Sequence, residues 1–222
     1  MAGVIMPDNA AIVAVAVAEA TNPTFGTSKQ FLKVHSVSYA NGKPEVAGIT
    51  ISADQLLAMV YFAVEDEEFF FVVSVSLASL TVEYAWVEDY HRVSFHATSE
   101  TSDVTQLSAL ISLQPTSTLN KGDKRGPGTG EWKYHSIEFE PNPEPNPFET
   151  KIEQLLTFLE QDATGIRALV DQAAGYLRVI SVFYNGNTSL GGISFDKETV
   201  RRMAALNLSV DFDLNAQGNF YK

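Results

Sequence analysis

A glycine-rich loop carries the main cluster of positively charged side chains in the chain. Backbone N–H groups of such loops, together with nearby cations, can bind a phosphate or a carboxylate. The spacing does not match a nucleotide-binding P-loop, and a solvated loop without a ligand is the alternative interpretation. The aromatic residues that follow could form one wall of a groove. The candidate ligand-binding residues are Lys121, Lys124, Arg125, Gly128, Trp132 and His135.

A run of acidic residues is the second candidate site. Carboxylates grouped in this way can attract a basic partner protein and raise the rate of association at low salt. The alternative is a turn whose charges are only solvated. The candidate partner-binding residues are Glu65, Asp66, Glu67 and Glu68, and the residues Glu83, Glu88 and Asp89 could extend the same patch.

The remaining polar residues indicate no catalytic or metal site. Asp211 and Asp213 share one face of an expected strand, but without a third ligand we expect a solvated strand face. His96 and His135 could be neighbours across strands, although no zinc-ligand spacing is present among the histidines. The four histidines are His35, His91, His96 and His135. We therefore expect structural histidines, no metal, no cofactor and no catalytic residue, since a nucleophile elbow is also missing from the sequence.

The composition of the chain is that of a globular, acidic protein. The chain has 222 residues, no cysteine and a formal net charge of −12, of which residues 1–89 carry −8 and residues 90–222 carry −4. Such acidity argues against nucleic-acid binding, because like charges repel. The absence of cysteine excludes disulfides and agrees with a reducing, cytoplasmic location. Residues 10–20 are too short to span a membrane and lack the basic start of a signal peptide, so we expect a buried element there and no membrane association.

The elements expected in residues 1–89 are mostly strands. The apolar stretch 10–20 fits a helix by its alanines and a strand by its spaced valines, and both readings stay open. Asn41-Gly42 is typical of a tight hairpin turn. Ser52 resembles a helix N-cap, followed by a short helix that includes Met59. The expected strands are residues 32–39, 46–51, 69–77 and 80–86.

The elements expected in residues 90–222 alternate between strands and amphipathic helices. Ser102 is expected to cap the first helix, and Asp196 the last one. Asn146, Pro147 and Glu149 are expected to begin a helix with a capping box. Gly175 is expected to follow a helix C-terminus, and Asn185-Gly186 to form a second hairpin. The apolar residues expected to face the core from the last strand are Leu208, Val210, Phe212 and Leu214.

Two passages of the chain resemble each other. Residues 31–60 and 176–204 both contain an apolar run, an Asn-Gly turn, a further glycine, a capping residue and a methionine in the same order. This agreement predicts a strand–turn–strand–helix unit used twice. The expected fold class is α+β, with a mixed or antiparallel sheet and packed helices. We expect a strand-rich N-terminal lobe with a partial repeat over residues 1–89, and an α+β domain over residues 90–222.

Residues 90–217 also resemble a bacterial family, the domain-of-unknown-function family 4279. The features that carry the resemblance are VSFHATS, SDVTQLSALISLQP, NKGDKRG, EWKYHSIEF, IEQLLTFLE and RRMAALNLSVDFDL, in this order. The resemblance implies an α+β fold with a mixed sheet and supplies no catalytic residues. Residues 1–89 depart from the family pattern and match it only through the repeat.

These observations favour a non-catalytic protein-binding module, of the kind found among immunity proteins and antitoxins, whose partner is a basic protein. The first alternative is a small-molecule binding protein or enzyme that holds an anion near Lys121–Trp132. The second alternative is a structural or oligomerising protein that uses an exposed strand edge within residues 69–77.

Overall fold

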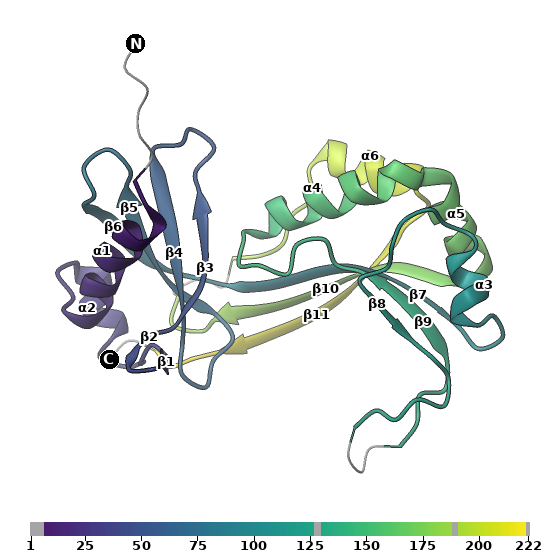
Figure 1. The fold of residues 1–222 in the computed structure, drawn as a ribbon, viewed down its shortest axis with the longest axis horizontal. Helices are drawn as coiled ribbons and strands as arrows, with labels where there is room; N and C mark the ends of the chain where they lie inside the picture. Colours follow the sequence, from purple (N-terminus) through teal and green to yellow (C-terminus); the bar gives the residue numbers. More distant parts are fainter. Residues whose placement is uncertain (1–6, 127–129, 188–190, 221–222) are drawn as a thin grey trace.

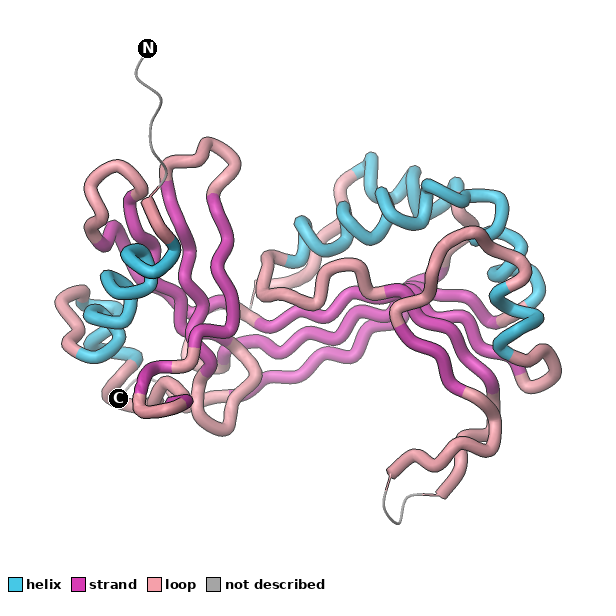
Figure 2. Tube along the Cα trace, in the orientation of Figure 1, coloured by secondary structure: helices cyan, strands magenta, loops and turns pink. Residues whose placement is uncertain are grey.

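The computed structural model describes residues 7–126, 130–187 and 191–220, which form two β-sheets with helices packed on each. Figure 1 shows the four-stranded sheet of the N-terminal lobe on one side and a longer five-stranded sheet on the other. Figure 2 shows that the helices of the longer sheet gather on one of its faces. The predicted α+β class, with a mixed sheet, is therefore confirmed.

The N-terminal lobe is an antiparallel sheet in the order β3-β4-β5-β6, covered by α1. Its strands are β3 (Val46–Ile51), β4 (Leu57–Ala63), β5 (Phe70–Ser76) and β6 (Val82–Glu88). Its helices are α1 (Asn9–Thr21) and α2 (Gly26–Phe31), and β1 (Tyr39–Ala40) pairs with β2 (Lys43–Pro44) in a small hairpin. The open question about residues 10–20 is thus decided in favour of a helix. Ile12, Ala16 and Ala20 recur every fourth residue and form its buried face.

Two expected elements of this lobe are wrong. We expected a strand over residues 32–39, but α2 ends at Phe31, and the segment contains only an isolated β-bridge from Val37 to Val64 and the start of the short strand Tyr39–Ala40. The chain turns directly after α2, where the Val34 and His35 N–H groups donate to the Phe31 carbonyl, and the Phe31 ring stacks on Phe71 at 5.1 Å. The helix expected after Ser52 is strand β4, which lies between β3 and β5; all seven of its residues are apolar and four of them are buried. Burial between two strands overrides the weak helical spacing.

The Asn41-Gly42 turn is confirmed. Asn41 has φ 53° and Gly42 has φ 76°, which is the left-handed conformation that a tight hairpin requires. The strand that returns from this turn is the short β2, however, and β3 pairs with β4 instead.

The second sheet has the order β11-β10-β7-β9-β8. Its strands are β7 (Tyr90–Ser99), β8 (Ser117–Leu119), β9 (His135–Phe139), β10 (Ala174–Tyr184) and β11 (Ser209–Gln217). Strands β10 and β11 are parallel, and the other neighbours are antiparallel. Because β11 runs parallel to β10, the turn at Asn185-Gly186 does not form the expected hairpin, and the chain crosses over through α6 before it returns.

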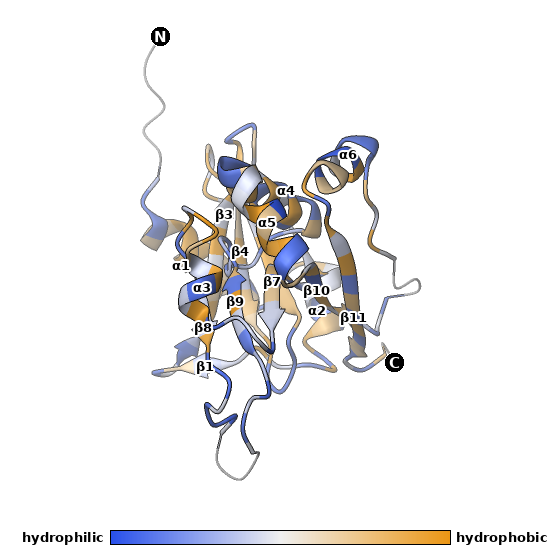
Figure 3. Cartoon of the chain, turned by 90° about the vertical axis from the view of Figure 1, so that its right-hand side faces the viewer, coloured by the Kyte–Doolittle hydropathy of each residue, from blue (hydrophilic) through white to orange (hydrophobic). Residues whose placement is uncertain are grey.

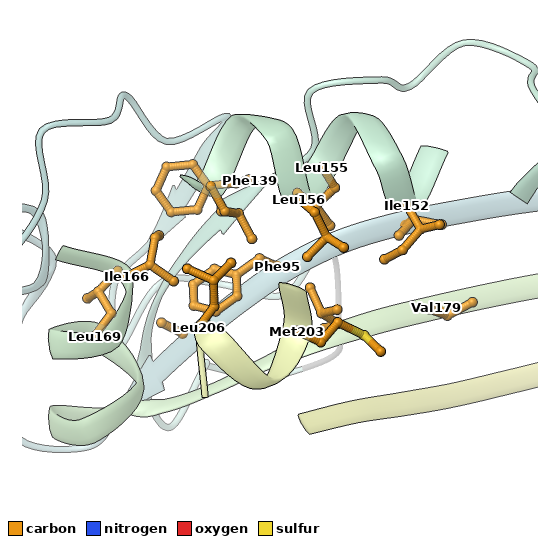
Figure 4. Packing of buried hydrophobic residues seen from close by; sticks show 14 of the residues in the cluster. Phe95, Phe139, Ile152, Leu155, Leu156, Ile166, Leu169, Val179, Met203 and Leu206 are labelled. Atoms are coloured by element: carbon orange, nitrogen blue, oxygen red, sulfur yellow. The ribbon is translucent and has the colours of Figure 1, made fainter. Parts of the chain in front are cut away.

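Helices cover one face of this sheet and enclose its core (Figure 4). They are α3 (Val104–Ser108), α4 (Phe148–Leu159), α5 (Ala163–Gln172) and α6 (Lys197–Ala205). The predicted stripe of α4 is confirmed, since Ile152, Leu155 and Leu156 are buried against Phe95 and other core residues. A short 3-10 turn, Glu160–Asp162, joins α4 to α5.

Several predicted helix ends need correction. Asp103, not Ser102, caps α3 through a full capping box with Gln106. Helix α4 begins at Phe148 after Pro147, and no side chain caps it, so the capping box from Asn146 to Glu149 is absent. Gly175 lies in β10, and Ala173 ends α5. The cap by Asp196 on α6 is confirmed.

The two resembling passages adopt different structures in the described residues. Residues 52–60 form a turn and part of β4, whereas the matching Asp196 caps helix α6. The aligned glycines also have different roles. A Cβ atom on Gly48 would lie 2.8 Å from Pro145, while Gly192 has open space around it. The strand–turn–strand–helix unit is therefore not present twice.

Strand β11 and its neighbour β10 reach into the N-terminal lobe. Tyr184 at the end of β10 is fully buried and belongs to the core cluster of that lobe, with its ring 4.9 Å from Phe69. The Gly218 backbone approaches the same two rings. The two sheets are thus joined in two ways. Asp89 links β6 to β7 along the chain, and the ends of β10 and β11 pack against the N-terminal lobe.

Candidate protein-binding surface

The acidic run Glu65–Glu68 forms the turn between β4 and β5, as predicted. Glu65, Asp66 and Glu68 are exposed, and Glu67 is half-buried. Asp66 has φ 60°, a conformation that aspartate tolerates better than most residues. The turn therefore presents three exposed acidic residues to solvent. We refer to these four residues as the acidic turn.

Contacts with distant parts of the chain hold the acidic turn in place. The Glu65 N–H donates to the Ser36 carbonyl at 2.9 Å. The Glu68 N–H donates to the side-chain oxygen of Gln217, at the end of β11, at 3.1 Å. The turn is consequently anchored on both sides, which lowers the conformational entropy that binding a partner would cost.

The buried His35 contacts the acidic turn from the protein interior. Its Nε2 accepts the Asn219 N–H at 3.1 Å, and its Nδ1 is 4.0 Å from a carboxylate oxygen of Glu67. Its ring stacks on Phe31. This histidine therefore has the structural role that the sequence indicated, and it connects the C-terminal segment to the acidic turn.

The other carboxylates assigned to the patch lie differently. Glu83 is exposed, but Glu88 and Asp89 are half-buried at the junction of the two sheets. Glu88 accepts the indole N–H of Trp86 at 2.6 Å, and Asp89 accepts the Tyr184 N–H at 2.8 Å. Burial raises the pKa of both carboxyl groups. They belong to the junction and do not extend the exposed patch.

Strand β11 is the outer strand of the second sheet and is mostly exposed. Asp211 and Asp213 lie on the sheet face opposite the helices, where Arg178 of β10 is 3.9 Å from Asp213. The predicted solvated face of these aspartates agrees with this position. The expected burial of the opposite residues is only partly correct. Val210 packs on the core, but Phe212 is 42% and Leu214 55% exposed.

A network of charges covers the helix-free face of the same sheet nearer its centre. Arg92 donates to Glu138 at 2.6 Å and to Glu140 at 2.8 Å, and His96 Nε2 lies 3.1 Å from Glu138. Burial alone would raise the pKa of Glu138, but His96, Arg92 and the Ser117 hydroxyl lower it to about 2. Glu138 is thus ionised near pH 7, and its carboxylate is already bound by Arg92, His96 and Ser117. His96 is paired in register with Glu138 and not with His135, which lies opposite Ser99.

The glycine-rich loop joins β8 to β9 and projects on the side of the sheet opposite α4 and α6 (Figure 1). Lys121, Lys124 and Arg125 are exposed, and the Lys121 ammonium donates to the Glu100 carbonyl at 3.3 Å. The Arg125 guanidinium lies 4.3 Å from the centre of the Trp132 ring. A ligand held by these cations would be bound at the surface and would compete with such contacts.

The other two predicted loop residues can be placed only in part. The His135 ring accepts the Lys121 N–H through Nδ1 at 3.3 Å, which joins the two sides of the loop. Gly128 lies outside the described residues. The loop site remains a prediction.

Sequence reasoning missed a pair of buried basic groups beside the junction. Lys151 is only 3% exposed and donates to the carbonyls of Asn142 at 2.9 Å and Glu144 at 2.6 Å. His91 lies near it, with Nδ1 2.8 Å from the Ser181 hydroxyl. A signal was present, because Lys151 occupies the apolar stripe of α4 beside Ile152.

The comparisons with known proteins identify the second half of the chain. The family described as a domain of unknown function (DUF4279) matches residues 88–217. The chain belongs to this family. The search of curated proteins and the search of solved structures gave no match.

The DUF4279 region begins at the end of β6 and stops at the last residue of β11, so it covers the whole second sheet. Strand β11 and the glycine-rich loop belong to it, while the acidic turn lies outside. Within the described parts of the chain, no group of three or more histidine or acidic side chains is arranged to hold a metal ion. None of the described helices is long and apolar enough to cross a membrane.

Proposed function

We propose that the protein is a non-catalytic protein-binding module whose partner is a basic protein, in the manner of immunity or antitoxin proteins. The observation that supports this proposal is the acidic turn. Its exposed carboxylates stand on a turn anchored by Ser36 and Gln217. A prearranged group of like charges favours fast association with an oppositely charged surface. The net charge of −12 extends the attraction over the whole molecule.

The polar groups of the second sheet support a role without catalysis. Glu138 is engaged by His96 and Arg92, and Asp89 by the Tyr184 N–H. His91 and Lys151 are buried and bound to groups of the protein itself. Side chains that make such contacts stabilise the fold, and they do not converge on one exposed pocket as the groups of a catalytic site would.

The test is affinity capture from native lysate with the purified protein immobilised, at low and at moderate salt, followed by a binding measurement with the purified partner. The charge reversal Glu65→Lys/Glu68→Lys should weaken the complex by about tenfold or more at low salt. Asp66 is left unchanged because of its left-handed backbone.

The matched control is Glu153→Lys/Asp171→Lys, which changes the net charge equally on exposed positions of α4 and α5. We expect this control to bind nearly as well as the wild type. Retention of no protein at low salt, or an equal loss in both variants, would contradict the proposed function. The variant Lys121→Ala/Lys124→Ala/Arg125→Ala tests the alternative. A small anion retained by the wild type and lost from this variant would favour the loop as the binding site.

A further inference from the structure

The free edge of β11 is the longest unpaired backbone segment of the second sheet. Strand β11 has nine residues, and seven of them are exposed. Figure 3 shows β11 at the margin of the sheet, with hydrophobic and hydrophilic bands alternating along it. Its inner edge pairs with β10 along its whole length, from Ser209 to Gln217.

The direction of the backbone groups follows from one hydrogen bond. The Gln217 carbonyl accepts the Asn185 N–H at 2.7 Å, so Gln217 directs its backbone groups toward β10. Because these directions alternate along a strand, the N–H and C=O groups of Val210, Phe212, Leu214 and Ala216 point away from β10. Among the described residues, no backbone partner is found for these outward groups.

Apolar and acidic side chains of β11 lie on opposite faces of the sheet. Phe212 and Leu214 lie on the helix side and remain substantially exposed. Asp211 and Asp213 lie on the other side, in line with Gln217, which contacts the acidic turn. A strand placed along this edge would therefore meet apolar groups on one face and carboxylates on the other.

We propose that β11 accepts an added strand from the partner protein, one in which apolar residues alternate with lysine or arginine. The added strand would complete the outward hydrogen bonds, cover Phe212 and Leu214, and place its basic side chains beside Asp211, Asp213 and the acidic turn. This inference rests on the proposed function, because it names the binding mode of the same basic partner.

A second copy of this chain fits the edge poorly. Pairing β11 with β11 would bring Asp211 and Asp213 of the two copies onto the same face, where like charges repel. Within each copy, Arg178 of β10 lies 3.9 Å from Asp213 and offsets part of this negative charge. It lies on the β10 side of β11, however, and not at the edge where the two copies would pair. Acidic residues on an edge strand are a known protection against self-association, and here they select for a basic strand.

The probe for the test is a synthetic eleven-residue peptide of alternating lysine and valine with blocked ends. We expect it to bind the full chain and to slow amide hydrogen exchange at Val210, Phe212, Leu214 and Ala216. The same peptide with glutamate in place of lysine should not bind. A peptide methylated at its central backbone nitrogens should also fail, because it cannot pair with the edge.

The matched variants are Leu214→Pro and Leu214→Val. Proline removes one outward N–H without taking a bond from the β10 side, whereas valine keeps the N–H. We expect Leu214→Pro to weaken peptide binding by about tenfold or more and Leu214→Val to bind nearly as the wild type. If Leu214→Pro does not fold, as judged by circular dichroism, the methylated peptide decides the question.

Four results would overturn the inference. The first is no binding of the lysine peptide at millimolar concentration, and the second is equal binding of the methylated peptide. The third is a wild-type dimer, seen by light scattering, that Leu214→Pro converts to a monomer, since this would assign the edge to a second copy. A native partner that needs Glu65 and Glu68 but binds Leu214→Pro normally would also reject added-strand pairing, while the proposed function would stand.

Discussion

His91 shows how burial determines the chemistry of a single side chain in this protein. It contacts the rings of Phe148 and Phe183, and its Nδ1 is paired with the Ser181 hydroxyl. Burial, together with the smaller effect of the nearby Lys151 charge, lowers its pKa to about 4. The imidazole is therefore neutral near pH 7. The unfolded chain takes up a proton near pH 6.5, so protonation favours unfolding.

This difference in pKa predicts a specific pH dependence of stability. Between pH 6.5 and pH 4 the unfolded state binds more protons at His91 than the folded state, so the free energy of unfolding falls as the pH falls. The loss should be about 3 kcal/mol across this range. The variant His91→Gln should lose less over the same range, as measured by urea unfolding at a series of pH values. An unchanged slope in His91→Gln would disprove the assignment.

Asp162 connects two helical elements of the DUF4279 region. It caps α5 by accepting the Gly165 N–H at 3.0 Å, and it also accepts the backbone N–H and the hydroxyl of Ser112, after α3. The two segments approach closely, since a Cβ atom on Gly165 would lie 2.7 Å from the Leu110 carbonyl. A single carboxylate thus both begins a helix and holds the neighbouring segment against it.

The variant Asp162→Ala should lower the free energy of unfolding by about 2 kcal/mol, because a cap and a charged hydrogen bond are lost together. The comparison variant Asp103→Ala removes only the cap of α3 and should cost about 1 kcal/mol. Chemical denaturation of the two variants checks the difference. Equal losses would show that the contacts with Ser112 contribute nothing measurable.

At the scale of the whole molecule, Tyr184 joins the two sheets. It lies at the end of β10, yet its ring contacts Phe31, Phe69 and His35 of the N-terminal lobe. The Tyr184 hydroxyl donates to the Asn219 carbonyl at 3.2 Å. A strand of the second sheet thus ends inside the core of the N-terminal lobe, and we therefore expect the two lobes to unfold as one cooperative unit.

Each lobe contains one of the two tryptophans, which makes this expectation measurable. Trp86 lies on β6, and Trp132 lies beside the glycine-rich loop. The variants Trp86→Phe and Trp132→Phe each leave one reporter, and their fluorescence transitions in urea should coincide. Tyr184→Ala should lower the midpoint of both transitions, at a cost of about 3–5 kcal/mol. Two separate midpoints in the otherwise unchanged chain would contradict this coupling of the two lobes.

Much of the local structure could be predicted from the sequence because local forces decide it. The Asn41-Gly42 turn requires a positive φ that few residue pairs adopt, the cap Asp196 precedes its own helix, and the stripe of α4 repeats at the helical period. The family of residues 88–217 and the position of the acidic turn follow from the order of such features.

Only the tertiary structure decided which elements are neighbours. The residues after Ser52 are a strand because β3 and β5 lie on both sides of them, and the residues 69–77 are not an edge because β4 and β6 flank β5. The exposed edge of β11 and its position beside the acidic turn depend on contacts between residues about 150 positions apart, such as Glu68 and Gln217. A sequence specifies local conformation through short-range sterics and hydrogen bonds, but the pairing of distant strands depends on the free energy of the entire packed core.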